Sequence, residues 1–104
     1  GFIGSPRMNL LPGSALGDDA ATVGIRPEDV QVGEGAREAD VTLVEPLGAW
    51  QLVTLRAGAL ELRALLPAAA PAPARTRFRI DPARLHRFDA SGSRMPQLQP
   101  GRDA

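Results

Sequence analysis

The clearest pattern in this chain is an alternation of apolar and polar residues between positions 41 and 66. Such alternation is typical of half-buried strands, and the pair Ala57-Gly58 in its middle predicts a tight hairpin turn. With these two turn residues, Thr54 lies opposite Glu61. One face of the hairpin is then apolar and consists of Val53, Leu55, Leu60, Leu62 and Ala64. The pattern favours this register, because a slip by a single position would bury two arginines among the leucines.

The end of the hairpin away from this turn breaks the alternation, because three large apolar residues fall on its otherwise polar face. They are Trp50, Leu52 and Leu65. Two explanations are open. Either the sheet curls into a small closed barrel that covers them, or a neighbouring subunit or domain covers them. We therefore treat these three residues as candidate interface residues.

Shorter apolar segments on both sides of the central hairpin predict further strands. The expected strands lie at residues 8–11, 23–25, 30–32 and 76–81, and a last short one begins at Met95. Residues 33–39 are expected to be a polar connector and residues 67–75, with alternating prolines, a loop. A single helical turn is expected to begin at Asp81-Pro82. The pattern predicts an all-β fold of short antiparallel strands with at most a short helical turn.

Composition limits the functions that this chain can have. The 104 residues suffice for one small domain, and twelve basic residues balance twelve acidic ones, so the net charge gives no reason to expect nucleic acid or an anionic membrane as partner. All basic residues are Arg; without Lys there is neither a phosphate-loop lysine nor a Schiff-base lysine. Without Cys and with one His, no thiolate or multi-histidine metal site is expected. We expect no catalytic, cofactor-binding or metal-binding residues, and no membrane insertion, because no apolar run is long enough.

A few polar positions deserve separate consideration as candidate sites. Arg26 and Glu28 flank Pro27, and they either contact another domain or form an ordinary surface turn with a local ion pair. Asp18-Asp19 offers too few oxygen ligands for calcium, so a solvated turn is expected there. His86 lacks partners for catalysis or metal binding and is expected to be a surface side chain.

Arginines are concentrated between positions 75 and 87. A groove for single-stranded nucleic acid would also need aromatic side chains for base stacking. The only aromatic residues nearby, Phe78 and Phe88, occupy positions expected to face the core. We therefore expect no nucleic-acid partner, and a free-standing nucleic-acid-binding protein is the weakest of the functional alternatives.

Three segments taken in order resemble the C-terminal regulatory region, the transport-associated OB (TOBE) domain, of ATP-binding subunits of ABC importers in the maltose and glycerol-3-phosphate branch. They are residues 2–11 (FIGSPRMNLL), 24–28 (GIRPE) and 81–89 (DPARLHRFD). Residues 44–48 (VEPLG) also resemble that family between them. The resemblance implies a small OB-type barrel. It further implies that residues 1–20 connect to a missing nucleotide-binding domain and include a possible edge strand, that residues 21–95 form the regulatory domain, and that residues 96–104 are a disordered tail.

The same resemblance implies a function. It suggests a non-catalytic regulatory and dimerisation domain of a bacterial importer for a sugar or a sugar phosphate such as glycerol 3-phosphate. ATP and Mg would be cofactors of the parent ATPase only. The implied partners are a second ATPase subunit, the missing nucleotide-binding domain and the membrane subunits, which would place the parent in the cytoplasm, peripheral to the inner membrane.

Two points qualify that expectation. The family usually has a tight Gly-containing turn where this chain has residues 67–75, so the surface presented there is expected to differ. The main alternative function is a module that binds small oxyanions, for which Arg26 and backbone amides near Gly24 are the candidate donors.

Overall fold

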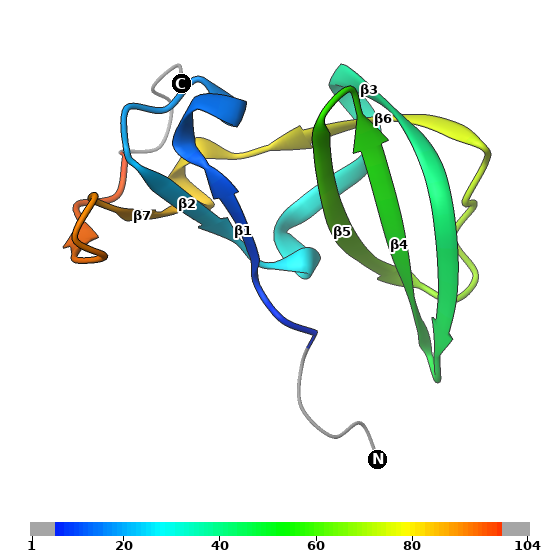
Figure 1. The fold of residues 1–104 in the computed structure, drawn as a ribbon. Coiled ribbons are helices and arrows are strands. Elements are labelled where there is room, and N and C mark those ends of the chain that lie inside the picture. Colours follow the sequence, from blue (N-terminus) through cyan, green and yellow to red (C-terminus); the bar gives the residue numbers. More distant parts are fainter. Residues whose placement is uncertain (1–5, 99–104) are drawn as a thin grey trace.

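Two four-stranded antiparallel sheets form the fold of residues 6–98, the part of the chain that the computed structural model describes (Figure 1). In sheet order, the first contains β1 (Asn9–Pro12), β2 (Thr22–Ile25), β7 (His86–Phe88) and β8 (Arg94–Met95). The second contains β5 (Leu60–Pro67), β4 (Trp50–Ala57), β3 (Val30–Leu47) and β6 (Arg75–Ile80). Three short 3-10 turns complete it: η1 (Gly13–Leu16), η2 (Pro27–Asp29) and η3 (Pro82–Arg84). The predicted all-β, OB-like fold with short helical turns is confirmed.

One hydrophobic core is shared by both sheets. The alternation in β4 and β5 turns the predicted apolar face inward, and all five of its residues are buried. Phe78 from β6 is fully buried beside them, whereas Ile80 is only partly buried against the core. Val23, Ile25 and Leu85 extend the same core to the first sheet. Continuous burial of apolar surface across both sheets is therefore what holds the small domain together.

The predicted register of the central hairpin is wrong by two residues, and its faces are right because a shift of two residues keeps each side chain on the same face. The two turn residues are Gly58 and Ala59, so Arg56 lies opposite Glu61 and Thr54 opposite Arg63. Gly58 has φ +63°, and a two-residue hairpin turn of the II′ kind needs a positive φ at its first central position. Glycine reaches that conformation without steric cost, which fixes the turn one residue later than expected.

The predicted polar connector at residues 33–39 is also wrong, because these residues belong to the long strand β3. Val32 and Arg37 both pair with Phe78, and the four residues between them form an irregularity in the ladder. Gly35, with φ +117°, lies so close that a Cβ there would be 2.3 Å from the Phe78 carbonyl oxygen. The glycines thus let one strand bend without ending, which composition alone cannot distinguish from a loop.

A side chain joins the two sheets where strand pairing stops. The Asn9 amide nitrogen donates to the carbonyl oxygens of Ile25 (3.1 Å) and Arg63 (2.9 Å), and its oxygen accepts from the Arg63 N–H (2.8 Å). Arg63 lies on β5, an outer strand of the second sheet. Asn9 therefore stands in for a neighbouring strand and fastens β1 to the second sheet. The strand predicted at residues 8–11 forms as β1, shifted by one residue.

The proline-rich segment after β5 is a loop, as predicted. Buried Gln51 holds it through its side-chain amide nitrogen, which donates to the carbonyl oxygens of Pro67 (3.0 Å) and Ala70 (2.8 Å). The loop is thus fastened by one polar side chain at the end of the inner face of β4.

Candidate functional site

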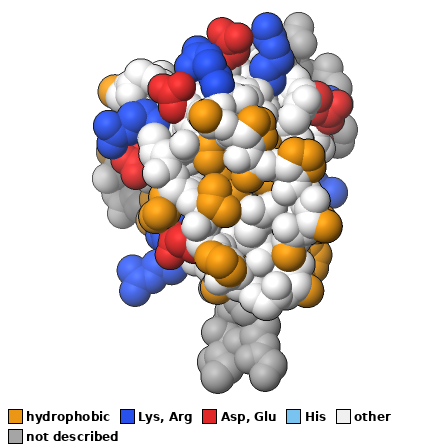
Figure 2. Space-filling view, turned by 90° about the vertical axis from the view of Figure 1, so that its right-hand side faces the viewer, with side chains coloured by type: hydrophobic (Ala, Val, Ile, Leu, Met, Phe, Trp, Pro, Cys, Tyr) orange, Lys and Arg blue, Asp and Glu red, His pale blue; other side chains and the backbone are white. Residues whose placement is uncertain are grey.

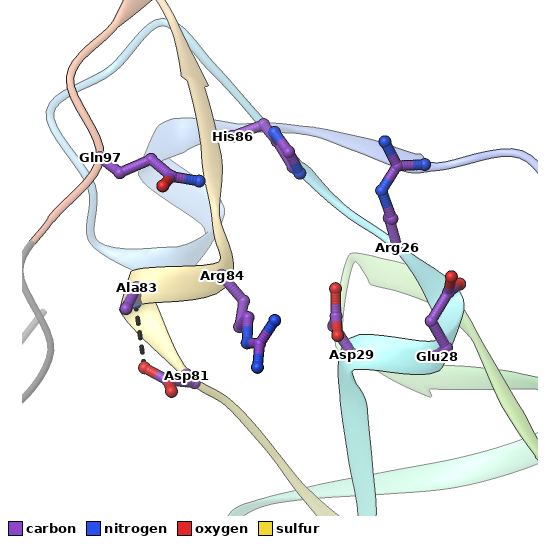
Figure 3. Close-up of a pocket in the computed structure, with 8 residues that line it drawn as sticks. All are labelled: Arg26, Glu28, Asp29, Asp81, Ala83, Arg84, His86 and Gln97. Atoms are coloured by element: carbon purple, nitrogen blue, oxygen red, sulfur yellow. Dashed lines mark hydrogen bonds between the residues drawn. The ribbon is translucent and has the colours of Figure 1, made fainter.

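Two proline-initiated turns face each other across an open hollow of about 660 Å³ (Figure 3). On one side are Arg26 and the turn η2, and on the other side are Asp81 and the turn η3. The complete lining is Arg26, Glu28, Asp29, Asp81, Ala83, Arg84, His86 and Gln97. The hollow thus collects charged side chains from two stretches that are far apart in the sequence, residues 26–29 and 81–84.

Local backbone chemistry makes both walls of the hollow rigid. Proline fixes its own φ and pushes the preceding residue into an extended conformation, which is how Arg26 and Asp81 enter their turns. The Asp29 N–H donates to the Arg26 carbonyl (2.9 Å), and the Arg84 N–H donates to the Asp81 carbonyl (2.9 Å). In addition, the Asp81 carboxylate accepts from the Ala83 N–H (3.0 Å). The predicted helical turn at Asp81-Pro82 is therefore confirmed.

The charges in the hollow are not matched with one another. Among the described residues, neither Arg26 nor Arg84 forms an ion pair within 4.0 Å, although Glu28 and Asp29 line the same space. Figure 3 shows the Arg84 guanidinium extending into the space between the turns, across from Asp29, whereas the Arg26 side chain points away from η2, on the side of the hollow where His86 lies. The local ion pair considered for Arg26 and Glu28 is therefore not formed.

His86 contributes a hydrogen-bond donor to this hollow. Its Nδ1 lies 3.0 Å from Arg94 Nη1, and because a guanidinium can only donate, Nδ1 accepts. The neutral imidazole then carries its proton on Nε2. His86 is half-buried on β7, between the two proline turns, so the sequence-based assignment to an ordinary surface position underestimated it.

The candidate interface residues of the hairpin lie in different environments. Trp50 is 44% exposed, Leu65 is half-buried and Leu52 is only 6% exposed. Leu43 and Val44 of β3 add further exposed apolar surface. Figure 2 shows the side of the molecule where β3 and β4 run, with hydrophobic side chains gathered over its middle and charged ones toward its upper end. Leu43 lies opposite Thr54 and Val44 opposite Val53, so their side chains point to opposite faces of the sheet, and Trp50 shares the face of Leu43. We call Leu43 and Trp50 the hairpin apolar surface.

A buried ion cluster lies elsewhere, and it corrects the prediction of a solvated turn at Asp18-Asp19. The Arg87 Nε donates to both carboxylate oxygens of Asp18 (3.1 Å each), and another of its nitrogens pairs with Asp19. The side chains of Asp18 and Arg87 are 2% and 9% exposed, whereas Asp19 is largely exposed. A third donor of Arg87 reaches the carbonyl oxygen of Pro96 (3.0 Å). The turn is therefore held from inside by an arginine far away in the sequence.

The cluster shifts the acid–base properties of its members. Burial of Asp18 opposes ionisation, but hydrogen bonds from Arg87 and from the Ala20 N–H outweigh it and lower the pKa of Asp18 below its ordinary value. The hydrogen bond to Asp18 raises the pKa of Arg87 in turn. Both groups therefore stay charged at neutral pH, as a buried pair must if it is to remain complete.

Comparison with known proteins identifies the family. The family model described as the TOBE domain matches residues 23–88, well over half of the chain. The chain belongs to the TOBE domain family. This matched range contains the turns on both sides of the hollow and the whole central hairpin, whereas Gln97 of the hollow and the carboxylates of Asp18 and Asp19 lie outside it.

Relatives of this TOBE domain are importer subunits. It is 35% identical to the sn-glycerol-3-phosphate import ATP-binding protein UgpC of Chromohalobacter salexigens, over 91% of this chain and 34% of that protein. It is 41% identical to the xylose/arabinose import ATP-binding protein XacK of Haloferax volcanii, over 54% of this chain and 22% of that protein. It is also 32% identical to the sulfoquinovosyl glycerol transport ATP-binding protein SmoE of Agrobacterium fabrum, over 90% and 35% respectively. The chain thus spans about a fifth to a third of these relatives.

Three further observations concern metal binding, membrane crossing and anion binding. Within residues 6–98, no three His, Cys, Asp or Glu side chains come together as a metal site would require. None of the helices among the described residues is long and apolar enough to cross a membrane. Gly24, near which backbone amides were expected to bind an oxyanion, pairs with β1 on one side and with β7 on the other. Its strand is therefore occupied by ladder hydrogen bonds, and the donors available around Arg26 are side chains.

Sequence inspection found Arg26 and Glu28 but missed the residues across the hollow from them. The signal was present as two X-Pro motifs with opposite charge order, Arg26-Pro27-Glu28-Asp29 and Asp81-Pro82-Ala83-Arg84. Each predicts a turn, but only the tertiary fold shows that the two turns face each other.

Proposed function

We propose that this TOBE domain is a non-catalytic regulatory and dimerisation domain of the ATP-binding subunit of an ABC importer for a sugar or a sugar phosphate such as glycerol 3-phosphate. The observation that carries this proposal is the identity to import ATP-binding proteins over about nine tenths of the chain. In the parent, ATP and Mg would bind to a separate nucleotide-binding domain. The chain's own residues would supply contacts rather than chemistry.

Contacts with a second ATPase subunit would use the hairpin apolar surface. Leu43 and Trp50 lie on the same face of the adjoining strands β3 and β4, and exposed apolar side chains on one face are typical of protein interfaces. Leu52 and Leu65 lie opposite each other beside Trp50 and would support its position from below. Arg26 and Glu28 would meet the nucleotide-binding domain or another partner through the hollow.

The same proposal implies where the full-length ATP-binding subunit, the parent of this domain, would be located in the cell. An ATP-binding subunit works together with membrane subunits, so the parent would be cytoplasmic and peripheral to the inner membrane. This TOBE domain would reach the membrane only through those subunits.

Sedimentation of the chain over a wide concentration range tests the dimerisation role. We expect the average mass to rise toward that of a dimer at high concentration. The variant Trp50→Ser should weaken this association about tenfold or more, because a buried aromatic side chain is a frequent hot spot. Trp50→Phe, which keeps an apolar ring, is the matched control and should associate nearly as well as the original chain. A strict monomer at high micromolar concentration would exclude self-association as a property of this domain.

A further inference from the structure

The hollow between η2 and η3 is lined by arginine side chains that have no ion-pair partner among the described residues, and it is large enough for a small ligand. The Arg84 guanidinium extends into it, Arg26 and His86 line its other end, and the Nε2–H of His86 is the ring donor that remains there. Its volume of about 660 Å³ lies within the range typical of small-molecule sites. Guanidinium groups match the oxygens of a phosphate group in geometry and charge, so the donors favour a phosphate-bearing ligand.

The carboxylates in the same hollow narrow the class of ligand. Asp81 is turned toward the Ala83 N–H and is engaged there (Figure 3), but Glu28 and Asp29 remain on the η2 side. Formal charges in the lining are two positive and three negative, so a bare anion would gain little from the hollow as a whole. Carboxylates accept hydrogen bonds from hydroxyl groups, however. A ligand that has both a phosphate and hydroxyl groups would use both sides.

We propose that this hollow binds a small hydroxylated phosphomonoester, that is, the phosphate ester of a polyol or sugar. Arg84 would hold the phosphate group, with Arg26 and His86 as further donors at the other end of the hollow, and Asp29 would accept from the hydroxyl groups. The proposal goes beyond a regulatory and dimerisation role, because it assigns a ligand class and a site to the domain.

The walls of the hollow are organised in advance for such a ligand. Pro27 is fully buried, and each turn is closed by its own backbone hydrogen bonds, so binding would order only the charged side chains. A smaller loss of conformational freedom leaves more of the interaction energy for affinity.

Calorimetric titration of the 104-residue chain with three probes tests the proposal. sn-Glycerol 3-phosphate should give saturable heat, inorganic phosphate should bind more weakly, and glycerol should give none. No saturable heat with sn-glycerol 3-phosphate at millimolar concentration would overturn the proposal. Equal affinity for inorganic phosphate and sn-glycerol 3-phosphate would overturn it as well, since it would remove the role of the hydroxyl groups.

Two variants assign the binding to this hollow. Arg84→Gln should weaken binding of sn-glycerol 3-phosphate about tenfold, as expected for the loss of a charge-assisted hydrogen bond. Arg79→Gln, which makes the same charge change at an exposed position of β6, is the matched control and should bind like the original chain. Asp29→Asn should reduce the preference for sn-glycerol 3-phosphate over inorganic phosphate. Equal weakening by Arg84→Gln and Arg79→Gln would show a general charge effect and would overturn the site.

The same experiments separate this proposal from the dimerisation role. Titration reports binding whether the chain is monomeric or dimeric, and sedimentation reports association without any ligand. A chain that dimerises but gives no heat overturns only the site. A monomer that binds sn-glycerol 3-phosphate overturns only the dimerisation.

Discussion

The cluster around Arg87 and the hollow around Arg84 both bring arginines close to carboxylates, and they differ in whether the charges are satisfied within the chain. In the cluster around Arg87, both partners are buried and almost every donor has an acceptor. In the hollow around Arg84, guanidinium and carboxylate groups share a space without pairing. The comparison suggests that the first region serves folding and that the second is available to a partner. Each prediction below tests that division.

The largest effect is expected from Arg87→Met. The substitution would leave the buried carboxylate of Asp18 without its partner, and breaking a buried ion pair in this way typically costs roughly 3–5 kcal/mol. Urea unfolding followed by circular dichroism measures the loss. The double variant Asp18→Asn/Arg87→Met should be less destabilised than the sum of the two single variants, because the unpaired charge is then removed. Strict additivity would mean that the pair is not coupled.

A smaller effect is expected from acid. The pKa of Asp18 is lower in the folded state than its ordinary value of 3.8. Its contribution to stability is therefore fully present above that ordinary value and is lost as the pH falls through the folded-state pKa. Urea midpoints measured at decreasing pH should fall more steeply for the original chain than for Asp18→Asn. Parallel curves for the two proteins would contradict the assignment.

The exposed ion pair of the central hairpin should matter less. Arg56 Nη2 and Glu61 Oε2 lie 3.0 Å apart, but more than half of each side chain is exposed to solvent. Pairs of this kind contribute about 0–1 kcal/mol, because water screens them and the side chains lose freedom. Arg56→Ala should therefore lower the free energy of unfolding by no more than about 1 kcal/mol. A loss as large as that of Arg87→Met would mean that exposure does not decide the value of these pairs.

The smallest effect on stability is expected in the hollow. Arg84→Gln and Arg26→Gln remove charges that have no ion-pair partner among the described residues, so each should change the free energy of unfolding by less than about 0.5 kcal/mol. The same urea experiment measures this. Marked destabilisation by either variant would place the hollow with the folding elements and not with the binding surfaces.

Sequence inspection predicted the sheet faces better than it predicted the contacts. Alternation gave the inward residues of β4, β5 and β6, because a strand in a half-buried sheet repeats every second residue. The hairpin register was missed, since a register shift of two residues preserves the faces and only the backbone of Gly58 decides between the two registers. The strand through residues 33–39 was not predicted, because its glycines allow the strand to bend and do not mark the place where it ends.

The candidate site was only partly accessible from sequence. Arg26 and Glu28 were found from their turn motif, but Arg84 and His86 join them only through the fold. The buried pair of Asp18 and Arg87 was not foreseen, since 69 positions separate them and no local pattern distinguishes this arginine from its exposed neighbours. Roles of the five candidate interface residues, including Trp50, Leu52 and Leu65, stay predictions until a partner is tested.

The position of Trp50 also has a practical consequence. It is the only tryptophan in a chain that has no tyrosine, and it lies half-exposed beside the Gly48-Ala49 turn. Ultraviolet emission excited at the red edge of aromatic absorption therefore comes from one known place on the surface. Any second body that covers this end of the hairpin would shift that emission toward the blue, so the protein carries its own optical sensor for assembly and needs no attached dye.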